Sequence, residues 1–213
     1  MYRDLKNVTV VDHPLVHHKL TVMRDKNTGT SVFRVLTQEI AALIAYEALR
    51  DLPLQDREIE TPLEKCVVPE LAEKQIALIP ILRAGLGMAD GIAMLLPTAK
   101  IGHIGMFRDP ETHLPHTYFT KLPDSMDERT ILILDPMLAT GNTAIEAVRS
   151  IREHGGKKIR FLCILAAPEG LRKLAEKEPD IQIVTACVDR CLNSNAYILP
   201  GLGDAGDRIF GTK

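Results

Sequence analysis

From residue 74 onward, short runs of valine, isoleucine and leucine alternate with stretches of helical periodicity. The apolar runs cover residues 76–81, 100–107, 131–134, 159–166 and 181–188, and the helical stretches cover residues 88–96, 143–154 and 169–177. Near-continuous apolar strands separated by helices are typical of a parallel sheet that helices cover on both faces. The sequence therefore predicts an α/β fold built on an open, mostly parallel, doubly wound sheet.

The first third of the chain has a different pattern and predicts an N-terminal α/β appendage. Residues 7–11 alternate like a short strand, and residues 16–24 have the spacing of a short helix. A longer helix is expected over residues 31–52, with Ser31 as its cap. Residues 57–68 are irregular, which favours short strands or a loop.

The length of the chain limits the number of domains. At about 1.4 times the ~150 residues of a typical domain, it fits one domain with an appendage better than two full domains. We expect a single domain over residues 1–213. Its parts are the appendage (1–73), the core sheet (74–190) and a glycine-rich C-terminal loop (191–213).

Composition excludes several kinds of partner. The chain has 26 Lys and Arg residues against 28 Asp and Glu residues, a net charge of −2, so no global basic field attracts nucleic acid or an anionic membrane. Its apolar runs are shorter than the ~18 residues of a membrane span, and its first residues do not resemble a signal peptide. Cys66, Cys163, Cys187 and Cys191 form no C-x-x-C pair, which indicates free thiols. We therefore expect a protein of the reducing cytoplasm.

The strongest local motif is ILILDPMLATGNTAIEAVRSI, at residues 131–151. A buried strand leads to Asp135, and a short loop with Thr140 and Gly141 precedes a helix that begins at about Thr143. At the carboxyl edge of a parallel sheet, the unpaired amides of a helix N-terminus favour a phosphate. An ionised aspartate there accepts hydrogen bonds from sugar hydroxyls. The alternative is an ordinary strand-to-helix turn with a side-chain cap.

A second motif, PILRAGLGM, covers residues 80–88 at the end of another expected strand. Its small residues let a large anion approach the backbone, and Arg83 supplies a fork of donors that suits a diphosphate. The alternative is a structural Arg83 paired with an acid. The third glycine of GLGMADG comes one position too late for a dinucleotide-binding motif.

The segment RDPETHLPHTYFTKL, at residues 108–122, is too long for a tight turn and too polar for the core. We expect it to form a flap or a long hairpin. A cover of this kind shields a reactive intermediate from water. His113 and His116 have H-x-x-H spacing, but no third ligand is near in sequence, so a metal site is the weaker interpretation.

The C-terminal segment, residues 191–213, is rich in glycine and lacks helical periodicity. Its GLGDAG matches G-x-G-x-x-G, but no buried strand of the usual length precedes it and too few residues follow for a helix. These glycines suit a tight loop whose backbone groups meet a flat polar ring edge to edge. The alternative is a tail that only packs against the sheet or a partner subunit.

Taken in order, four motifs resemble the uracil phosphoribosyltransferases, a family of type I phosphoribosyltransferases. They are PILRAGLGM, GMFRDPET with YFTKLP, DPMLATG, and YILPGLGDAGDRIFGTK at the C-terminus. The resemblance extends from about residue 13 to residue 213. Asp135 is followed by Pro136, as in the uracil family. Many other phosphoribosyltransferases have a second acid at this position. Asn142 stands where a glycine is expected.

The resemblance implies a type I phosphoribosyltransferase sheet with a flap hairpin, and it implies an activity. The 5-phosphoribosyl group of 5-phospho-α-D-ribose 1-diphosphate (PRPP) is transferred to N1 of uracil, giving UMP and diphosphate in pyrimidine salvage. The implied PRPP-binding residues are Arg83, Arg108, Asp135, Pro136, Met137, Leu138, Ala139, Thr140, Gly141, Asn142, Thr143 and Asp204. The implied uracil-binding residues are Ile198, Gly203, Asp204 and Ala205.

The catalytic roles that follow are electrostatic. The resemblance implies that Arg83 and Arg108 stabilise charge on the leaving diphosphate, and we expect Asp204 to assist the loss of the N1 proton of uracil. We expect Mg²⁺ as cofactor, bound mainly through diphosphate oxygens and without a direct protein ligand, and no covalent nucleophile. A homo-oligomer is expected, and GTP, which activates some relatives, is a candidate effector.

Two rival functions stay open. The first is a regulator that keeps this fold and binds RNA, against which the acidic balance and the absence of Lys and Arg runs argue. The second is an enzyme of the same fold that uses another base. Competition between bases would separate that rival from the uracil enzyme.

Overall fold

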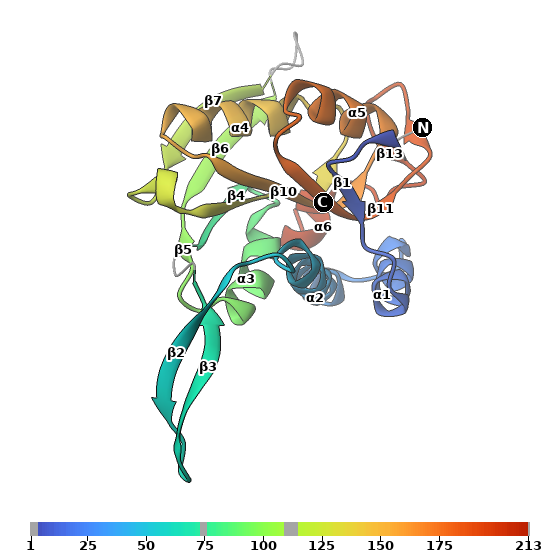
Figure 1. The fold of residues 1–213 in the computed structure, drawn as a ribbon. Helices are drawn as coiled ribbons and strands as arrows, with labels where there is room; N and C mark the ends of the chain where they lie inside the picture. The colour runs from blue at the N-terminus through green and yellow to red at the C-terminus, as the bar shows by residue number, and fades with distance from the viewer. Residues whose placement is uncertain (1–3, 73–75, 109–114, 213) are drawn as a thin grey trace.

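A nine-stranded sheet forms the centre of the computed structural model, which describes residues 4–72, 76–108 and 115–212 (Figure 1). Its strands are β1 (Val8–Val10), β4 (Ile76–Leu82), β5 (Lys100–Ile101), β6 (His103–Arg108), β7 (Pro115–Lys121), β8 (Thr130–Leu134), β9 (Met137–Leu138), β10 (Lys158–Ala166) and β11 (Gln182–Val188). They lie in the order β1-β11-β10-β8-β4-β6-β7, with β5 beside β4 and β9 beside β10. Neighbouring strands are parallel except β6 and β7. The predicted, mostly parallel sheet is confirmed.

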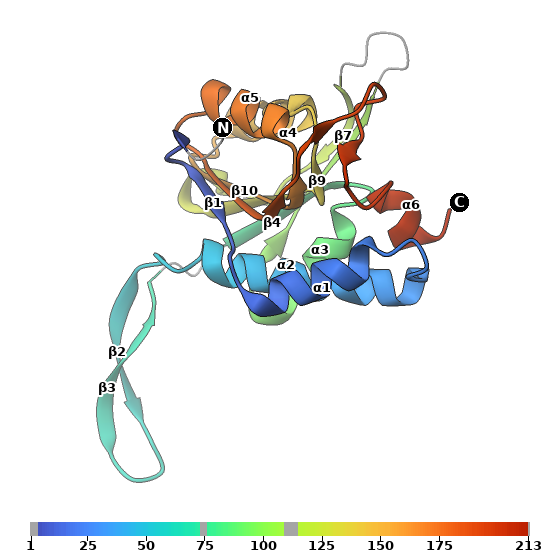
Figure 2. The ribbon, with the colours of Figure 1, turned by 90° about the vertical axis from the view of Figure 1, so that its right-hand side faces the viewer.

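Helices cover both faces of this sheet, as Figures 1 and 2 show. The helices are α1 (Pro14–Arg24), α2 (Thr30–Ala48), α3 (Leu86–Leu95), α4 (Asn142–Glu153), α5 (Pro168–Lys177) and α6 (Ala205–Phe210). Leu132 and Leu134 of β8 pack on the side of α1, α2, α3 and α6. Ile131 and Ile133 of the same strand pack on the side of α4 and α5. Both faces of the strand are buried, which confirms the doubly wound arrangement.

The N-terminal third joins the main sheet and its helical layer. β1 pairs in parallel with β11 at the edge of the sheet. α2 begins at Thr30 with Gly29 as its N-cap and ends at Ala48, so the prediction of a helix over residues 31–52 capped by Ser31 is wrong at both ends. Gly29 is extended there, and its carbonyl accepts a hydrogen bond from the Phe33 N–H, which already closes the first turn. The division of the chain at residues 73 and 191 stays a prediction.

Of the two alternatives for residues 57–68, short strands or a loop, the structure shows strands, which belong to a regular antiparallel hairpin. β2 (Leu54–Glu60) and β3 (Lys65–Leu71) pair in register along their full length. We call this hairpin the arm, because it projects away from the rest of the molecule in both views. Neither strand has a buried face, so its sequence lacks the apolar alternation by which a strand is recognised.

The glycine-rich C-terminal segment contains a short hairpin and a helix. β12 (Cys191–Leu192) pairs with β13 (Ile198–Leu199), and α6 follows Asp204, whose side chain caps the helix by accepting a hydrogen bond from the Asp207 N–H. The expectation that no helix follows the glycines is wrong. α6 has only 6 residues, fewer than two turns, so no apolar period develops in its sequence.

The predicted flap is confirmed as a hairpin of β6 and β7, which pair from His103 and Lys121 to Arg108 and Pro115. Its tip, including His113, lies outside the described residues. Over the described ranges, no helix is long and apolar enough to cross a membrane.

Candidate active site

A cavity of about 470 Å³ lies where β4, β8 and β9 end. It is lined by Ala84, by residues 135, 137–141, 143 and 144, and by residues 195–198 and 203–206. Ligands bind in this place in open α/β sheets, at the carboxyl ends of the strands. The cavity therefore brings together two motifs that are about sixty residues apart in sequence.

The loop from Asp135 to Thr143 is tied to β10 through its backbone. The carbonyl of Pro136 accepts hydrogen bonds from the Ile164 and Leu165 N–H groups, both at 3.0 Å, and β10 thereby holds the loop. The N–H groups of Thr140 and Gly141 have no hydrogen-bond partner in the part of the chain that the structure describes. Both residues line the cavity. Free amides before a helix are an anion-binding arrangement.

Gly141 gives the loop its sharp turn into α4. Its φ of +82° is left-handed, and a Cβ here would lie 3.0 Å from the Gly170 carbonyl. α5 packs still more closely on the loop, because a Cβ on Gly170 would meet the Ala139 oxygen at 2.2 Å. Asn142, one residue later, begins α4, so the left-handed position is Gly141. Its side-chain oxygen accepts a hydrogen bond from Lys173 at 2.5 Å.

Arg83 follows β4 at the edge of the cavity. Its guanidinium lies over the Phe210 ring, 5.7 Å from the centroid, and no acid pairs with it among the described residues. The sharp turn that follows depends on Gly85, where a Cβ would lie 2.3 Å from the Leu134 oxygen. Ala84 lines the cavity between them, but Arg83 itself does not. The alternative of an acid-paired Arg83 is not supported.

Four predicted uracil-binding residues line the same cavity from its other side: Ile198, Gly203, Asp204 and Ala205. Gly203 has a left-handed φ of +83°. Its N–H and C=O have no hydrogen-bond partner within the described ranges, so this glycine offers both a donor and an acceptor. Asp204 Oδ1 accepts a hydrogen bond from the Asp207 N–H at 2.9 Å, which fixes the carboxylate at the cavity wall.

Besides Arg83, the structure separates two predicted residues from the cavity wall and leaves the side chain of a third undescribed. Pro136 and Asn142 belong to the loop but do not line the cavity. Arg108 is the last residue of β6, and its side chain lies outside the described part. Over the described residues, no group of three His, Cys, Asp or Glu side chains gathers as a metal site.

Sequence reasoning missed a turn that completes the cavity, formed by Asn195, Ala196 and Tyr197. Asn193 shapes it: its side-chain oxygen accepts hydrogen bonds from the Asn195 and Tyr197 N–H groups, both at 2.9 Å. Ala196 takes a left-handed φ of +61°. The asparagine-rich NSN sequence was the available signal, because asparagine side chains form such turns.

Behind the C-terminal loop, Arg24 and Asp189 form an ion pair at 2.6 Å, which no sequence pattern indicated. Burial raises the pKa of the Asp189 carboxyl, but hydrogen bonds from Arg24 and Gly201 outweigh it and hold this pKa below its usual value.

In β10, burial raises the pKa of the Cys163 thiol to about 12, so this thiol is protonated at neutral pH. All four cysteines are free thiols.

Comparison of the sequence with protein families matches residues 10–212 to the model of the uracil phosphoribosyltransferases. A uracil phosphoribosyltransferase of Levilactobacillus brevis is 56% identical over 204 residues, which cover 96% of this chain and 98% of that one. One from Bacillus thuringiensis is 55% identical over the same shares.

Comparison with solved structures gives the same fold. A protein of Aquifex aeolicus is 38% identical, covers 97% of this chain and 99% of its own, and has a TM-score of 0.92. Adenine phosphoribosyltransferase of Trypanosoma brucei, solved with AMP, pyrophosphate and ribose-5-phosphate, is 13% identical with a TM-score of 0.58, over 94% and 90% of the two chains. At that identity the likeness concerns the fold alone.

Proposed function

The chain belongs to the uracil phosphoribosyltransferase family, and from this premise we propose how its residues carry out the reaction. It is a pentosyltransferase that moves the phosphoribosyl group of PRPP to uracil and gives UMP and diphosphate. The observation that carries the proposal is the single cavity shared by the loop after β8 and the C-terminal loop. One loop suits a phosphorylated sugar and the other a base, so the two reactants meet between them.

On the PRPP side, we assign the 5-phosphate to the loop that runs from Asp135 to Thr143. The N–H groups of Thr140 and Gly141 support this assignment, because they have no partner among the described residues and belong to residues that line the cavity. Asp135 at the strand end accepts hydrogen bonds from the ribose hydroxyls. Arg83 and Arg108 stabilise the negative charge that develops on the diphosphate as it leaves.

On the uracil side, the backbone of residues 198–205 reads the base edge, and Asp204 assists the loss of the N1 proton. Support comes from Gly203 on the cavity wall, whose N–H and C=O have no partner in the described part of the chain. Holding N1 of uracil against C1 of the ribose supplies much of the rate enhancement, since two reactants become one oriented complex.

Mg²⁺ fits the chemistry of this cavity. Asp135 and Asp204 are the carboxylates on its wall, and carboxylate and diphosphate oxygens are the hard ligands that Mg²⁺ prefers. We propose that diphosphate oxygens would mainly hold the ion, and that Asp135 and Asp204 would be the protein carboxylates facing it. Bound Mg²⁺ would neutralise charge on the leaving diphosphate.

The direct test follows UMP formation from labelled uracil, PRPP and the purified full chain, with and without Mg²⁺. We expect product with Mg²⁺ and a large loss of rate when EDTA removes the ion. A protein that accepts another base in preference to uracil, or that retains RNA and makes no UMP, would contradict the assignment.

Replacing Asp135 with asparagine should weaken PRPP binding and leave the fold intact. The change keeps the shape of the side chain, but a neutral amide is a poorer acceptor for ribose hydroxyls than a carboxylate. We expect KM for PRPP to rise by about tenfold, in line with the ~1.4 kcal/mol of a charged hydrogen bond. Steady-state kinetics with PRPP varied at saturating uracil measures it, and an unchanged KM and kcat would refute the role.

The arm supports the proposal that the enzyme is a homo-oligomer. An isolated two-stranded hairpin is marginally stable in water, yet this one exposes Leu54 (61%), Leu63 (94%) and Val67 (59%). Contact with a second subunit would cover these side chains.

By resemblance, GTP is the effector to test in the same assay. The four free thiols suit a reducing cytoplasm.

A further inference from the structure

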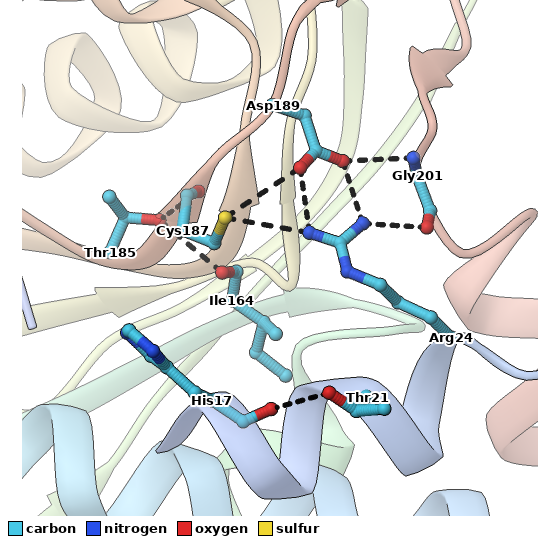
Figure 3. Close-up of polar contacts among 8 residues, drawn as sticks. All are labelled: His17, Thr21, Arg24, Ile164, Thr185, Cys187, Asp189 and Gly201. Carbon is cyan, nitrogen blue, oxygen red and sulfur yellow. Dashed lines mark hydrogen bonds and ion pairs between the residues drawn. The ribbon is translucent and has the colours of Figure 1, made fainter. Parts of the chain in front are cut away.

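Arg24, which is partly exposed, and Asp189, which is buried, form a bidentate ion pair next to the C-terminal loop (Figure 3). Arg24 ends α1, and Asp189 directly follows β11. Arg24 Nη1 donates to Asp189 Oδ2 at 2.8 Å, and Arg24 Nη2 donates to Asp189 Oδ1 at 2.6 Å. The Asp189 side chain is only 4% exposed. Two parallel hydrogen bonds fix the orientation of both groups as well as their separation.

Both members of the pair also hold the backbone of Gly201. Arg24 Nη1 donates to the Gly201 carbonyl at 2.8 Å, and the Gly201 N–H donates to Asp189 Oδ2 at 2.8 Å. Figure 3 shows the two side chains meeting this residue from two different elements. Gly201 has a left-handed φ of +65°, and a Cβ on it would lie 2.1 Å from the Ile198 oxygen. The Gly201 backbone is therefore held in place by the two side chains that hydrogen-bond to its N–H and carbonyl.

The pair is itself anchored in the sheet. The Asp189 N–H donates to the Ala166 carbonyl at the end of β10, and the Arg190 N–H donates to the Leu199 carbonyl of β13, both at 2.9 Å. The central sheet and α1 thus converge on one residue of the loop. Ile198 and Gly203, which stand three residues before and two residues after Gly201, line the cavity.

We propose that Arg24 and Asp189 are positioning residues for uracil, acting through Gly201 on the backbone that reads the base. The proposal rests on the assignment of residues 198–205 to the uracil side of the cavity. A shift of the Gly201 backbone would move Ile198 and Gly203 together. The loop from Asp135 to Thr143, on the PRPP side, makes no hydrogen bond to either residue of the pair in the described structure. The pair should therefore affect the two substrates unequally.

A purely structural role makes a different prediction from a positioning role. Replacing a buried ion pair by well-packed apolar residues is often neutral or stabilising, whereas removing one partner leaves the other charge unpaired. Stability and uracil binding should therefore separate in the double variant Arg24→Met with Asp189→Leu. We expect the melting temperature of this variant to return toward that of the wild type. The Gly201 N–H and carbonyl would still lack their hydrogen bonds to residues 24 and 189.

The experiment measures KM for each substrate, kcat and melting temperature for four variants of the full chain. They are Asp189→Asn, Arg24→Gln, the apolar double variant, and Arg160→Gln as the control. Arg160 is a matched control because it also binds a carboxylate, Asp51 at 2.6 Å, and the Ala48 carbonyl, away from the cavity. We expect KM for uracil to rise by about ten- to hundredfold in the first three, and KM for PRPP to stay within about threefold.

Three outcomes would overturn the proposal: equal changes in both KM values, no change in either, or a double variant that regains wild-type KM for uracil. Arg160→Gln should lower the melting temperature without moving KM for uracil; the same uracil shift in this control would also count against the pair. If a variant fails to fold, Asp189→Asn, which is nearly isosteric, decides alone. A wild-type protein that makes no UMP would instead refute the proposed function, so the two failures are distinguishable.

Discussion

Replacing Arg83 with alanine is expected to lower kcat by about tenfold to a thousandfold, which corresponds to about 1.4–4 kcal/mol of transition-state stabilisation. The charge on the diphosphate grows as its bond to the ribose breaks. A guanidinium beside it therefore contributes more in the transition state than in the bound substrate. Such a residue reduces kcat and kcat/KM together when it is removed, while one that only binds substrate raises KM.

The structure supports a role for Arg83 in binding the diphosphate rather than in packing the core. Its guanidinium has no acidic partner among the described residues and lies over the Phe210 ring, 5.7 Å from the centroid. The turn that follows it is fixed by Gly85, which has no room for a Cβ against the Leu134 oxygen. A guanidinium beside the cavity whose donors make no hydrogen bond within the described ranges can meet a diphosphate with several of them.

The matched control for Arg83→Ala is Arg34→Ala. Arg34 also contacts α6, but its Nε and Nη2 donate to the Ile209 carbonyl at 3.2 and 3.0 Å, and it does not line the cavity. We expect Arg34→Ala to lower stability more than turnover. Arg108→Ala, at the end of β6, should lose turnover like Arg83→Ala. Full activity in both the Arg83 and Arg108 variants, with Mg²⁺ still required, would place the diphosphate elsewhere.

The sequence predicted the sheet and the loop after β8 because both are encoded locally. β4, β8 and β10 are buried on both faces, so apolar residues, mainly isoleucine and leucine, follow one another almost without interruption. The loop from Asp135 to Thr143 is one contiguous segment between a strand and a helix. Its position at the sheet edge follows from the topology alone.

The parts that the sequence did not predict depend on neighbours that are distant in the chain or on short elements. Arg24 and Asp189 are 165 residues apart, and an arginine in the last turn of a helix is ordinary in itself. The arm has no buried face, and α6 is too short for a helical period. Sequence pattern reports burial along one element, whereas these features arise from contacts between elements.

The second large effect that we expect is discrimination between uracil and cytosine as the accepting base. If the backbone of residues 198–205 reads uracil, an N–H must meet its O4 and a carbonyl must meet its N3–H. Gly203, on the cavity wall, provides one group of each kind that has no partner among the residues described. Cytosine reverses both patterns, since its 4-amino group donates and its unprotonated N3 accepts. Each mismatch leaves a buried polar group unpaired, at a cost of about 1–3 kcal/mol.

We therefore expect kcat/KM for cytosine to fall below that for uracil by a few powers of ten. The measurement is UMP or CMP formation with each base at saturating PRPP. 5-Fluorouracil is the control, because it changes the ring but keeps O4 and N3–H, and it should react within about tenfold of uracil.

Deleting the chain after Tyr197, the simplest alternative test, would not isolate the base pocket. The tail also buries Leu202, Ala205 and Ile209 in the core, so the truncated protein would lose stability together with the loop. Discrimination between bases tests the intact protein and needs no variant. Cytosine used as readily as uracil would mean that the backbone of residues 198–205 does not read the base, and that the base lies against another wall of the cavity.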